Sequence, residues 1–327
     1  MSLNTGQNGV GGTNPPALTI QDGFEDFGKQ SRAPSGSSIL DEGAIEEHGR
    51  TYHSYKQGTY LLPNDGAEQD RLDLQHAAVS LLLDGKLAWA PVVEPKNVLD
   101  VGTGTGIWAI EYAKRHPDCA VIGSDLSMIQ PTDAAANCSF VKEDAENDEW
   151  AYQCDFFDYV HLRLLFTCFG DIRPVLRNVY KHLKPGGWVE FQDHTPEVFS
   201  SDGSSSGTAM ERFGETLAKG LAAYGRDATR MKHLKDVLAA EGYIDIVEKV
   251  LPYPVGDWPK HPKYRDVGKW MAENVVRGLE GSVKMLLAGG LSTADVHDLV
   301  AQVKLEIQSG HVHAYMPFYV VYARKGD

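Results

Sequence analysis

The sequence predicts an α/β fold in which a Rossmann-like sheet carries helices on both faces. Two observations predict it. Between residues 97 and 193, short runs rich in β-branched and aromatic residues alternate with helical stretches, which is typical of βαβ units and a parallel sheet. A glycine loop follows the first of these runs and opens a helix, and such sheets bind nucleotide-like ligands at this position.

The alternation is justified segment by segment. Strands are predicted at NVLDVG (97–102), AVIGSDL (120–126), SFVKED (139–144), FDYVHLR (157–163) and WVEFQD (188–193), and helices at IWAIEYAKRH (107–116) and IRPVLRNVYKHL (172–183). Lys184-Pro-Gly-Gly187 is typical of a helix stop, because proline and glycine rarely continue a helix. We therefore expect the last strand of this series to begin after the two glycines.

Two segments precede this region. Residues 1–45 are rich in Gly, Ser, Asn and Pro and have little apolar pattern, so they predict a disordered tail. We interpret residues 46–95 as an N-terminal helical segment that lies over the ligand site. Its helix is expected within 67–88, because acidic residues occupy the first turn and one face repeats with helical spacing. That face holds Leu72, Gln75, Val79, Leu82 and Leu83.

Residues 96–327 are interpreted as the core, with helical cap insertions at about 196–242 and 255–310. Strands are predicted at 244–250 and 314–324, on either side of the second insertion. We expect two helices within this insertion. Insertions of this length must pack somewhere, and we expect them to cover the carboxyl ends of the strands, where open α/β sheets bind ligands.

Composition excludes several classes of protein. No apolar run approaches the roughly 20 residues of a spanning helix, so a membrane is not an expected partner. The formal net charge of −14 would repel a phosphate backbone, so nucleic acid is not an expected partner either. Several basic residues between 226 and 235 leave two alternatives open, a local basic patch and a solvated helix face.

The cysteines and the N-terminus indicate the cellular setting. Four cysteines are spread without a C-x-x-C pair, so the sequence predicts neither a zinc site nor a disulfide framework, and no metal is expected. The first residues lack the basic start and apolar stretch of a secretory signal, which favours a cytoplasmic location.

The glycine loop is the first candidate binding element. Its predicted ligand-binding residues are Gly102, Thr103, Gly104 and Gly106. The dinucleotide fingerprint would need a glycine where Ile107 stands, which disfavours a nicotinamide cofactor. Asp100, just before the loop, would place a carboxylate near an ammonium group, whereas a pyrophosphate would be repelled by it. The loop therefore favours a cofactor with an amino acid end.

Two carboxylates after the next two strands complete the predicted site. Asp125 ends the second strand, and its two oxygens can accept both hydroxyls of a ribose. Asp144 and Ala145 follow the third strand, where a carboxylate and a backbone N–H can bind an adenine's exocyclic amine and ring nitrogen. Leu126, next to Asp125, is included in the predicted cofactor site.

These residues resemble class I S-adenosylmethionine-dependent methyltransferases, and the resemblance covers residues 97–193. It extends toward the N-terminus, where several motifs are similar to fungal LaeA-like methyltransferases. The motifs are Tyr52-His-Ser-Tyr55, Gly58-x-Tyr60, Leu62-Pro-Asn-Asp65, Glu68-x-Asp-Arg-Leu-Asp-Leu-Gln-His76, His161-x-Arg163 and Leu183-Lys-Pro-Gly-Gly-Trp-Val-Glu190. The resemblance implies S-adenosyl-L-methionine as cofactor and a sheet that ends in an antiparallel pair. It also makes a nuclear location an alternative to the cytoplasm.

The resemblance further implies that Tyr60 folds over the cofactor and that His161 lies near its sulfonium. Arg163 is included among the cofactor residues, and it could instead bind an acidic substrate or pair with Glu190. Methyl transfer depends mainly on positioning and desolvation, so a dedicated base is optional. His161 and His194, near the carboxyl ends of two strands, are the candidate catalytic bases, and His194 is favoured.

Three functions remain open at this point. The first is O- or N-methylation of a small molecule, in secondary metabolism, with the late helices forming an apolar acceptor pocket. Its candidate lining is Met210, Phe213, Tyr224, Trp258, Trp270, Met271 and Phe318. The second is a LaeA-like regulatory protein that acts through protein partners. The third uses the cofactor without methyl transfer, because one fold serves many functions.

Overall fold

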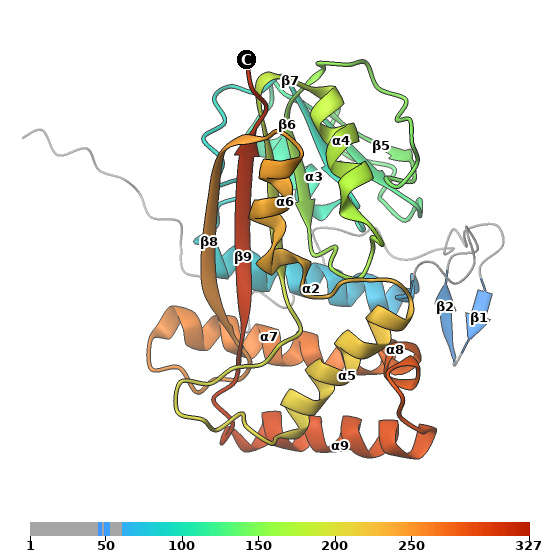
Figure 1. Ribbon diagram of the computed structural model, residues 1–327, viewed down its shortest axis with the longest axis vertical. Helices are drawn as coiled ribbons and strands as arrows, with labels where there is room; N and C mark the ends of the chain where they lie inside the picture. The colour runs from blue at the N-terminus through green and yellow to red at the C-terminus, as the bar shows by residue number, and fades with distance from the viewer. Residues whose placement is uncertain (1–44, 48, 53–60) are drawn as a thin grey trace, which may run out of the picture. The chain divides into compact units, whose positions relative to one another are not determined.

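The structure of this chain is a computed structural model that describes residues 45–47, 49–52 and 61–327 (Figure 1). Almost all of the predicted disordered tail, residues 1–44, lies outside the described residues. A short antiparallel pair, β1 (Ile45–Glu47) and β2 (Arg50–Tyr52), begins the described part.

Seven strands form the main sheet, in the order β5-β4-β3-β6-β7-β9-β8. They are β3 (Asn97–Val101), β4 (Ala120–Asp125), β5 (Cys138–Lys142), β6 (Phe157–Arg163), β7 (Leu183–His194), β8 (Ile244–Pro254) and β9 (Tyr315–Arg324). β3 to β7 pair in parallel, and β9 runs antiparallel to both β7 and β8. The prediction of an α/β fold with a Rossmann-like sheet that ends in an antiparallel pair is therefore confirmed.

Helices cover both faces of this sheet because successive side chains of a strand point to opposite faces. Tyr159 of β6 packs with Trp108 of α3 (Ile107–Arg115) on one face. The next residue, Val160, enters the cluster of the other face with Leu176 of α4 (Ile172–His182) and Leu238 of α6 (Leu234–Ala240). These side chains are almost fully buried, and each contributes about 1.5 to 3 kcal/mol of transfer free energy.

A separate group of helices gathers at the carboxyl ends of the parallel strands, at the lower end of the sheet in Figure 1. They are α2 (Gly66–Leu82), α5 (Ala209–Ala223), α7 (Pro262–Gly281), α8 (Val283–Ala288) and α9 (Thr293–Ser309). Val79, Met271 and Leu299 pack with Phe318 of β9 in one buried cluster, which ties this helical layer to the sheet. None of the described helices is both long and apolar enough to cross a membrane.

Three local features differ from the sequence prediction. The range 196–242 is divided, because α5 joins the helical layer whereas α6 packs on the sheet beside β8 and β9. The stretch after 255 holds three helices, where we expected two. The glycines of Lys184-Pro-Gly-Gly187 lie within β7, where the pairing with β6 shifts register and Gly186 adopts a left-handed φ of 76°. The helix therefore ends earlier, at His182.

Candidate cofactor and acceptor site

One cavity of about 250 Å³ extends from the glycine loop into the helical layer. Its first half is lined by residues at the carboxyl ends of β3, β4, β5 and β6. Its second half is lined by α2, α5, α7, α8 and the residues after β7. The predicted residues that line it are Asp100, Gly102, Thr103, Gly104, Asp125, Leu126, Asp144, Ala145, Arg163 and His194. Segments far apart in the sequence thus line one cavity.

The glycine loop turns sharply between β3 and α3. Gly102, Gly104 and Gly106 all have left-handed φ angles, of 67°, 57° and 79°, which glycine adopts without strain. At Gly102 an added Cβ would also lie 2.5 Å from Cδ2 of Leu165, so the Leu165 side chain would have to move to admit it. Gly106 does not line the cavity; it is the N-cap residue of α3. The loop thus presents its backbone to the cavity.

Asp125, at the end of β4, is fixed by backbone donors. Its Oδ2 accepts from the Gly104 N–H at 2.8 Å, and its Oδ1 accepts from the Ser127 N–H at 3.0 Å. Each oxygen keeps a lone pair for a ligand. Burial raises the pKa of this carboxyl to about 6, against the lowering effect of those N–H groups. The arrangement has the acceptors that a diol requires.

Asp100 lies between a buried support and the cavity. Its Oδ1 pairs with Nδ1 of His161 at 2.7 Å, and its Oδ2 accepts from the Thr103 hydroxyl at 2.6 Å. His161 is fully buried, stacks on the Trp108 ring at 3.7 Å between centroids, and is absent from the cavity wall. The sequence predicts that His161 binds the cofactor, whereas in the structure its side chain does not line the cavity. His161 of β6 is the register partner of Asp100 of β3, and both residues lie just before the carboxyl ends of their strands. The imidazole therefore orients the Asp100 carboxylate.

The first half of the cavity is also lined, beyond the end of β5, by Asp144, Ala145 and Glu146. The Glu146 N–H donates to Oδ1 of Asp144 at 2.9 Å. Arg226, from the turn after α5, also reaches this end, with its Nη1 3.5 Å from Oε1 of Glu146. Both interpretations of the basic stretch 226–235 are therefore wrong at Arg226 and at Arg230, because both side chains are buried and bonded.

Arg163 ends β6 and points into the cavity beside α2. Its Nη2 lies 2.7 Å from Nδ1 of His76, whose Nε2 lies 2.8 Å from Glu111. A guanidinium can only donate, so Nδ1 of His76 accepts and its Nε2–H donates to the carboxylate. Burial lowers the pKa of His76 to about 4, consistent with a neutral ring. The proposed pairing of Arg163 with Glu190 is wrong, because that carboxylate accepts from the backbone N–H groups of residues 89 and 90.

His194 ends β7 and lines the deeper half of the cavity. Its Nδ1 lies 3.2 Å from the Thr195 carbonyl oxygen, which can only accept, so Nδ1 carries the proton. Burial lowers the pKa of this ring to about 4. The neutral ring therefore has an unprotonated Nε2, which can accept a proton from a bound molecule.

The deeper half is mainly apolar. Of the predicted lining residues, Met210, Phe213 and Met271 line the cavity. Tyr224, Trp258, Trp270 and Phe318 do not, and Phe318 belongs to the buried cluster below. Further apolar lining comes from Leu217, Val255, Val275, Met285, Val303 and Met316.

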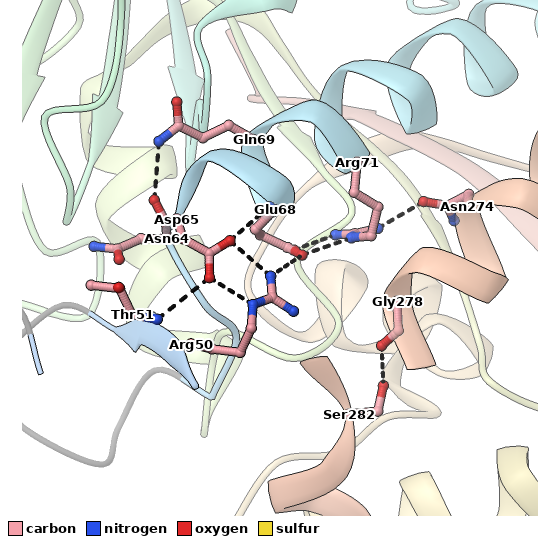
Figure 2. A network of polar contacts seen from close by, with 10 residues as sticks. All are labelled: Arg50, Thr51, Asn64, Asp65, Glu68, Gln69, Arg71, Asn274, Gly278 and Ser282. Carbon is pink, nitrogen blue, oxygen red and sulfur yellow. Dashed lines mark hydrogen bonds and ion pairs between the residues drawn. The ribbon is translucent and has the colours of Figure 1, made fainter. Parts of the chain in front are cut away.

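A buried polar network, which the sequence prediction missed, contributes to the wall of this deeper half, and we call this part of the wall the roof of the chamber. Figure 2 shows the hydrogen bonds and ion pairs of the network. Arg71 of α2 donates to both oxygens of Glu68, at 2.6 and 3.0 Å, and its Nη1 donates to Oδ1 of Asn274 at 2.8 Å. On the other side of Glu68, Arg50 binds both oxygens of Asp65, at 2.6 and 2.8 Å. Glu68, Arg71 and Asn274 all line the cavity.

One signal could have located part of this network. Glu68, Arg71 and Gln75 follow helical spacing on the buried face of an otherwise amphipathic helix, and charged residues are rarely buried unless they are paired. Asn274 carried no such signal, because it lies 203 residues further along the chain. Tyr55 and Tyr60 lie outside the described residues, and Tyr52 is buried away from the cavity wall.

The sheet order, together with a cavity at the carboxyl ends of its strands, defines a Rossmann-like α/β protein of the class I methyltransferase type. A family model described as a methyltransferase domain matches residues 74–243. The chain belongs to this methyltransferase family.

Curated relatives cover most of the chain. Methyltransferase pytC of Aspergillus terreus is 35% identical over 285 residues, which cover 85% of this chain and 87% of the relative. Secondary metabolism regulator LAE1 of Cochliobolus heterostrophus is 33% identical, covering 85% and 94%. Protein-methionine methyltransferase laeA of Emericella nidulans is 31% identical, covering 91% and 81%. The relatives are thus named both as methyltransferases and as regulators.

Proposed function

We propose that this chain transfers a methyl group from S-adenosyl-L-methionine to an oxygen or nitrogen of a small molecule of secondary metabolism. The observation that carries the proposal is the continuity of the cavity, which joins the glycine loop to a mainly apolar chamber lined by residues of the helical layer. Small-molecule sites are concave and mostly apolar, with a few placed polar groups.

The residues of the first half fit the cofactor. The left-handed glycines give backbone access, and Asp125 has free lone pairs for both ribose hydroxyls. Asp144 and Ala145 would bind the adenine. Asp100 would bind the ammonium, and Arg163 would bind the carboxylate of the amino acid end, which matches opposite charges at the same end of the cavity. The cofactor supplies an electrophilic methyl group on a sulfonium.

The chain's own contribution is to position the acceptor and exclude water. The apolar lining, including Met210, Phe213 and Met271, desolvates the acceptor. His194 offers an unprotonated Nε2 toward the chamber, so it would take the proton of an acceptor hydroxyl or amine as that atom is methylated. Its low pKa makes it a weak base, so we expect positioning to supply most of the rate.

Incubation of the protein with methyl-labelled cofactor and an extract of its source organism tests the proposal. Label in a low-molecular-weight product is the expected result, and His194→Asn should reduce that product more than it reduces cofactor affinity. Label confined to protein would instead favour the activity named for the Emericella relative. The absence of any label, with cofactor binding intact, would favour use of the cofactor without methyl transfer.

A regulatory role is the second candidate, and the name of the LAE1 relative favours it. It would place the chain in a complex with protein partners, in the cytoplasm or the nucleus. A stable complex purified from the source organism, in which substitution of the cavity residues leaves the regulatory effect intact, would support this role over small-molecule turnover.

A further inference from the structure

The polar network in the roof of the deeper chamber is placed where an acceptor would bind. Two different faces of α2 contribute to the site. Leu72 and Asp73 face the glycine loop, where the Asp73 carboxylate accepts from the Thr105 hydroxyl at 2.7 Å. Arg71 instead faces α7, with its Cδ 3.7 Å from the position of a Cβ at Gly278. The guanidinium of Arg71 therefore belongs to the acceptor half of the cavity.

Among the residues that the structure describes, Arg71 has more donors than acceptors that bind them. Its three hydrogen bonds to Glu68 and Asn274 leave one N–H on each terminal nitrogen, because a guanidinium carries five N–H groups. Asn274 uses its oxygen to accept from Arg71, so its amide N–H groups are the part that can face a ligand. One of these makes only a weak contact of 3.4 Å with the Met271 sulfur. The roof thus offers donors to whatever occupies the chamber.

The network is also held in place from behind (Figure 2). Asp65 caps the N-terminus of α2 through the Glu68 N–H at 3.0 Å, and it is bound bidentately by Arg50. The second terminal nitrogen of Arg50 lies 4.0 Å from the Glu68 carboxylate. Such anchoring fixes Arg71 before a ligand arrives, which reduces the entropy lost on binding.

The charges of the network cancel. Arg50 and Arg71 face Asp65 and Glu68, so the roof donates hydrogen bonds without a net positive charge. A carboxylate ligand at the roof would be buried beside Glu68, where both arginines of the network already have carboxylate partners, and burial of an unpaired charge is costly. A neutral oxygen with a lone pair meets these donors without that cost.

We propose, on the basis of the proposed function, that Arg71 and Asn274 select the acceptor by binding a neutral carbonyl oxygen on an otherwise apolar molecule. The apolar walls bind the body of the molecule, and the roof fixes its orientation relative to His194. The substrate class is therefore an uncharged ketone, ester or amide that carries the methylated atom elsewhere in its framework.

Calorimetry on the full chain, saturated with S-adenosylhomocysteine, tests this proposal with three bicyclic probes. They are 1-tetralone, its deoxygenated analogue tetralin, and 1-naphthoate. We expect wild-type protein to bind 1-tetralone about tenfold more tightly than tetralin, because one hydrogen bond to a charged donor is worth at least that factor. It should also bind 1-tetralone more tightly than 1-naphthoate.

The paired substitution Glu68→Gln with Arg71→Met removes both charges together, so no carboxylate is left buried alone. It should reduce the preference for 1-tetralone over tetralin by about tenfold. Asn274→Leu leaves the ion pair intact and should reduce the same preference even if the paired variant does not fold. Glu273→Gln with Arg277→Met, an exposed pair on the same helix, is the matched control and should leave the preference unchanged.

Equal binding of 1-tetralone and tetralin by wild-type protein would overturn the proposal, as would tighter binding of 1-naphthoate. Failure of both neutral probes to bind up to their solubility would overturn it too. These outcomes are distinct from failure of the proposed function, which would appear earlier as a failure to bind S-adenosylhomocysteine at all.

Discussion

His161 Nδ1 and Asp100 Oδ1 lie 2.7 Å apart, with both side chains buried at the centre of the sheet. This pair connects the hydrophobic core to the cavity, because the His161 ring stacks on Trp108 while Asp100 lines the cavity. A carboxylate that is held by two donors has a fixed orientation, which favours one direction of approach for a ligand ammonium. His161 is thus a positioning residue.

Removal of this support should weaken cofactor binding. We expect His161→Leu to raise the Kd for S-adenosylhomocysteine about tenfold, because a hydrogen bond to a charged group contributes about 1.5 kcal/mol or more. His161→Asn, which keeps an N–H donor, should restore most of the affinity. Calorimetry measures both variants, and equal losses for Leu and Asn would assign the effect to packing alone.

The two ends of the cofactor can be tested separately. 5′-Methylthioadenosine has the adenosine of S-adenosylhomocysteine but lacks its amino acid end. We expect Arg163→Met to weaken the binding of S-adenosylhomocysteine by about tenfold or more and to leave the binding of 5′-methylthioadenosine unchanged. Competition binding with both ligands measures this difference. Equal weakening of the binding of both ligands would contradict the proposal that Arg163 binds the carboxylate of the amino acid end.

Cofactor affinity should depend on pH through Asp125. Burial raises the pKa of this carboxyl to about 6 in the ligand-free protein. Ribose hydroxyls need the ionised form as their acceptor, so below pH 6 a proton must leave before the ligand binds. Affinity should therefore be constant above about pH 7 and fall up to about tenfold per pH unit below pH 6. Asp125→Asn should bind weakly at every pH and lose this dependence, as calorimetry between pH 5 and 8 would measure.

His194 should make the fold sensitive to acid. Its pKa is about 4 in the folded state because the ring is buried, and about 6.5 in an unfolded chain. Between these values the unfolded state binds a proton that the folded state excludes, so the free energy of unfolding falls as the pH falls. As the pH falls from 7 to 4, we expect the free energy of unfolding of His194→Asn to rise by about 3 kcal/mol relative to that of wild type.

Urea unfolding of both proteins at each pH measures that difference. Comparison with wild type is needed because Asp125 and Asp193 have raised pKa values, to about 6 and about 7, and contribute with the opposite sign. A relative stability that did not change with pH would mean that His194 takes up its proton at the same pH in the folded and unfolded states, which would contradict the lowered pKa.

Gly102 should tolerate no side chain. Gly102→Ala forces alanine into a left-handed conformation and places its Cβ 2.5 Å from the Leu165 side chain. Gly207 has a similar φ of 73° with nothing within 4 Å, so Gly207→Ala isolates the backbone strain of about 1 kcal/mol. Thermal unfolding should give a larger loss for Gly102→Ala, and only that variant should lose cofactor affinity. Equal losses would mean that Leu165 yields without cost.

Much of the fold could be predicted from the sequence because its signals are local. The strand, glycine loop and helix around Gly104 lie within a few residues of each other, and β6 lies where the run FDYVHLR predicts it. Asp125 was predictable for the same reason, since the ends of neighbouring parallel strands must meet at one edge of the sheet.

The sequence by itself therefore determined the α/β class, the sheet and most of the residues that line the half of the cavity proposed to bind the cofactor. Only the tertiary structure decided the rest. In the folded chain His161 lies behind Asp100 and not on the cavity wall. The fold also brings Arg71 into contact with Asn274, which lies 203 residues further along the chain. The physical reason is that strand and turn preferences act between near neighbours, whereas the acceptor chamber depends on how separate helices pack over the strand ends.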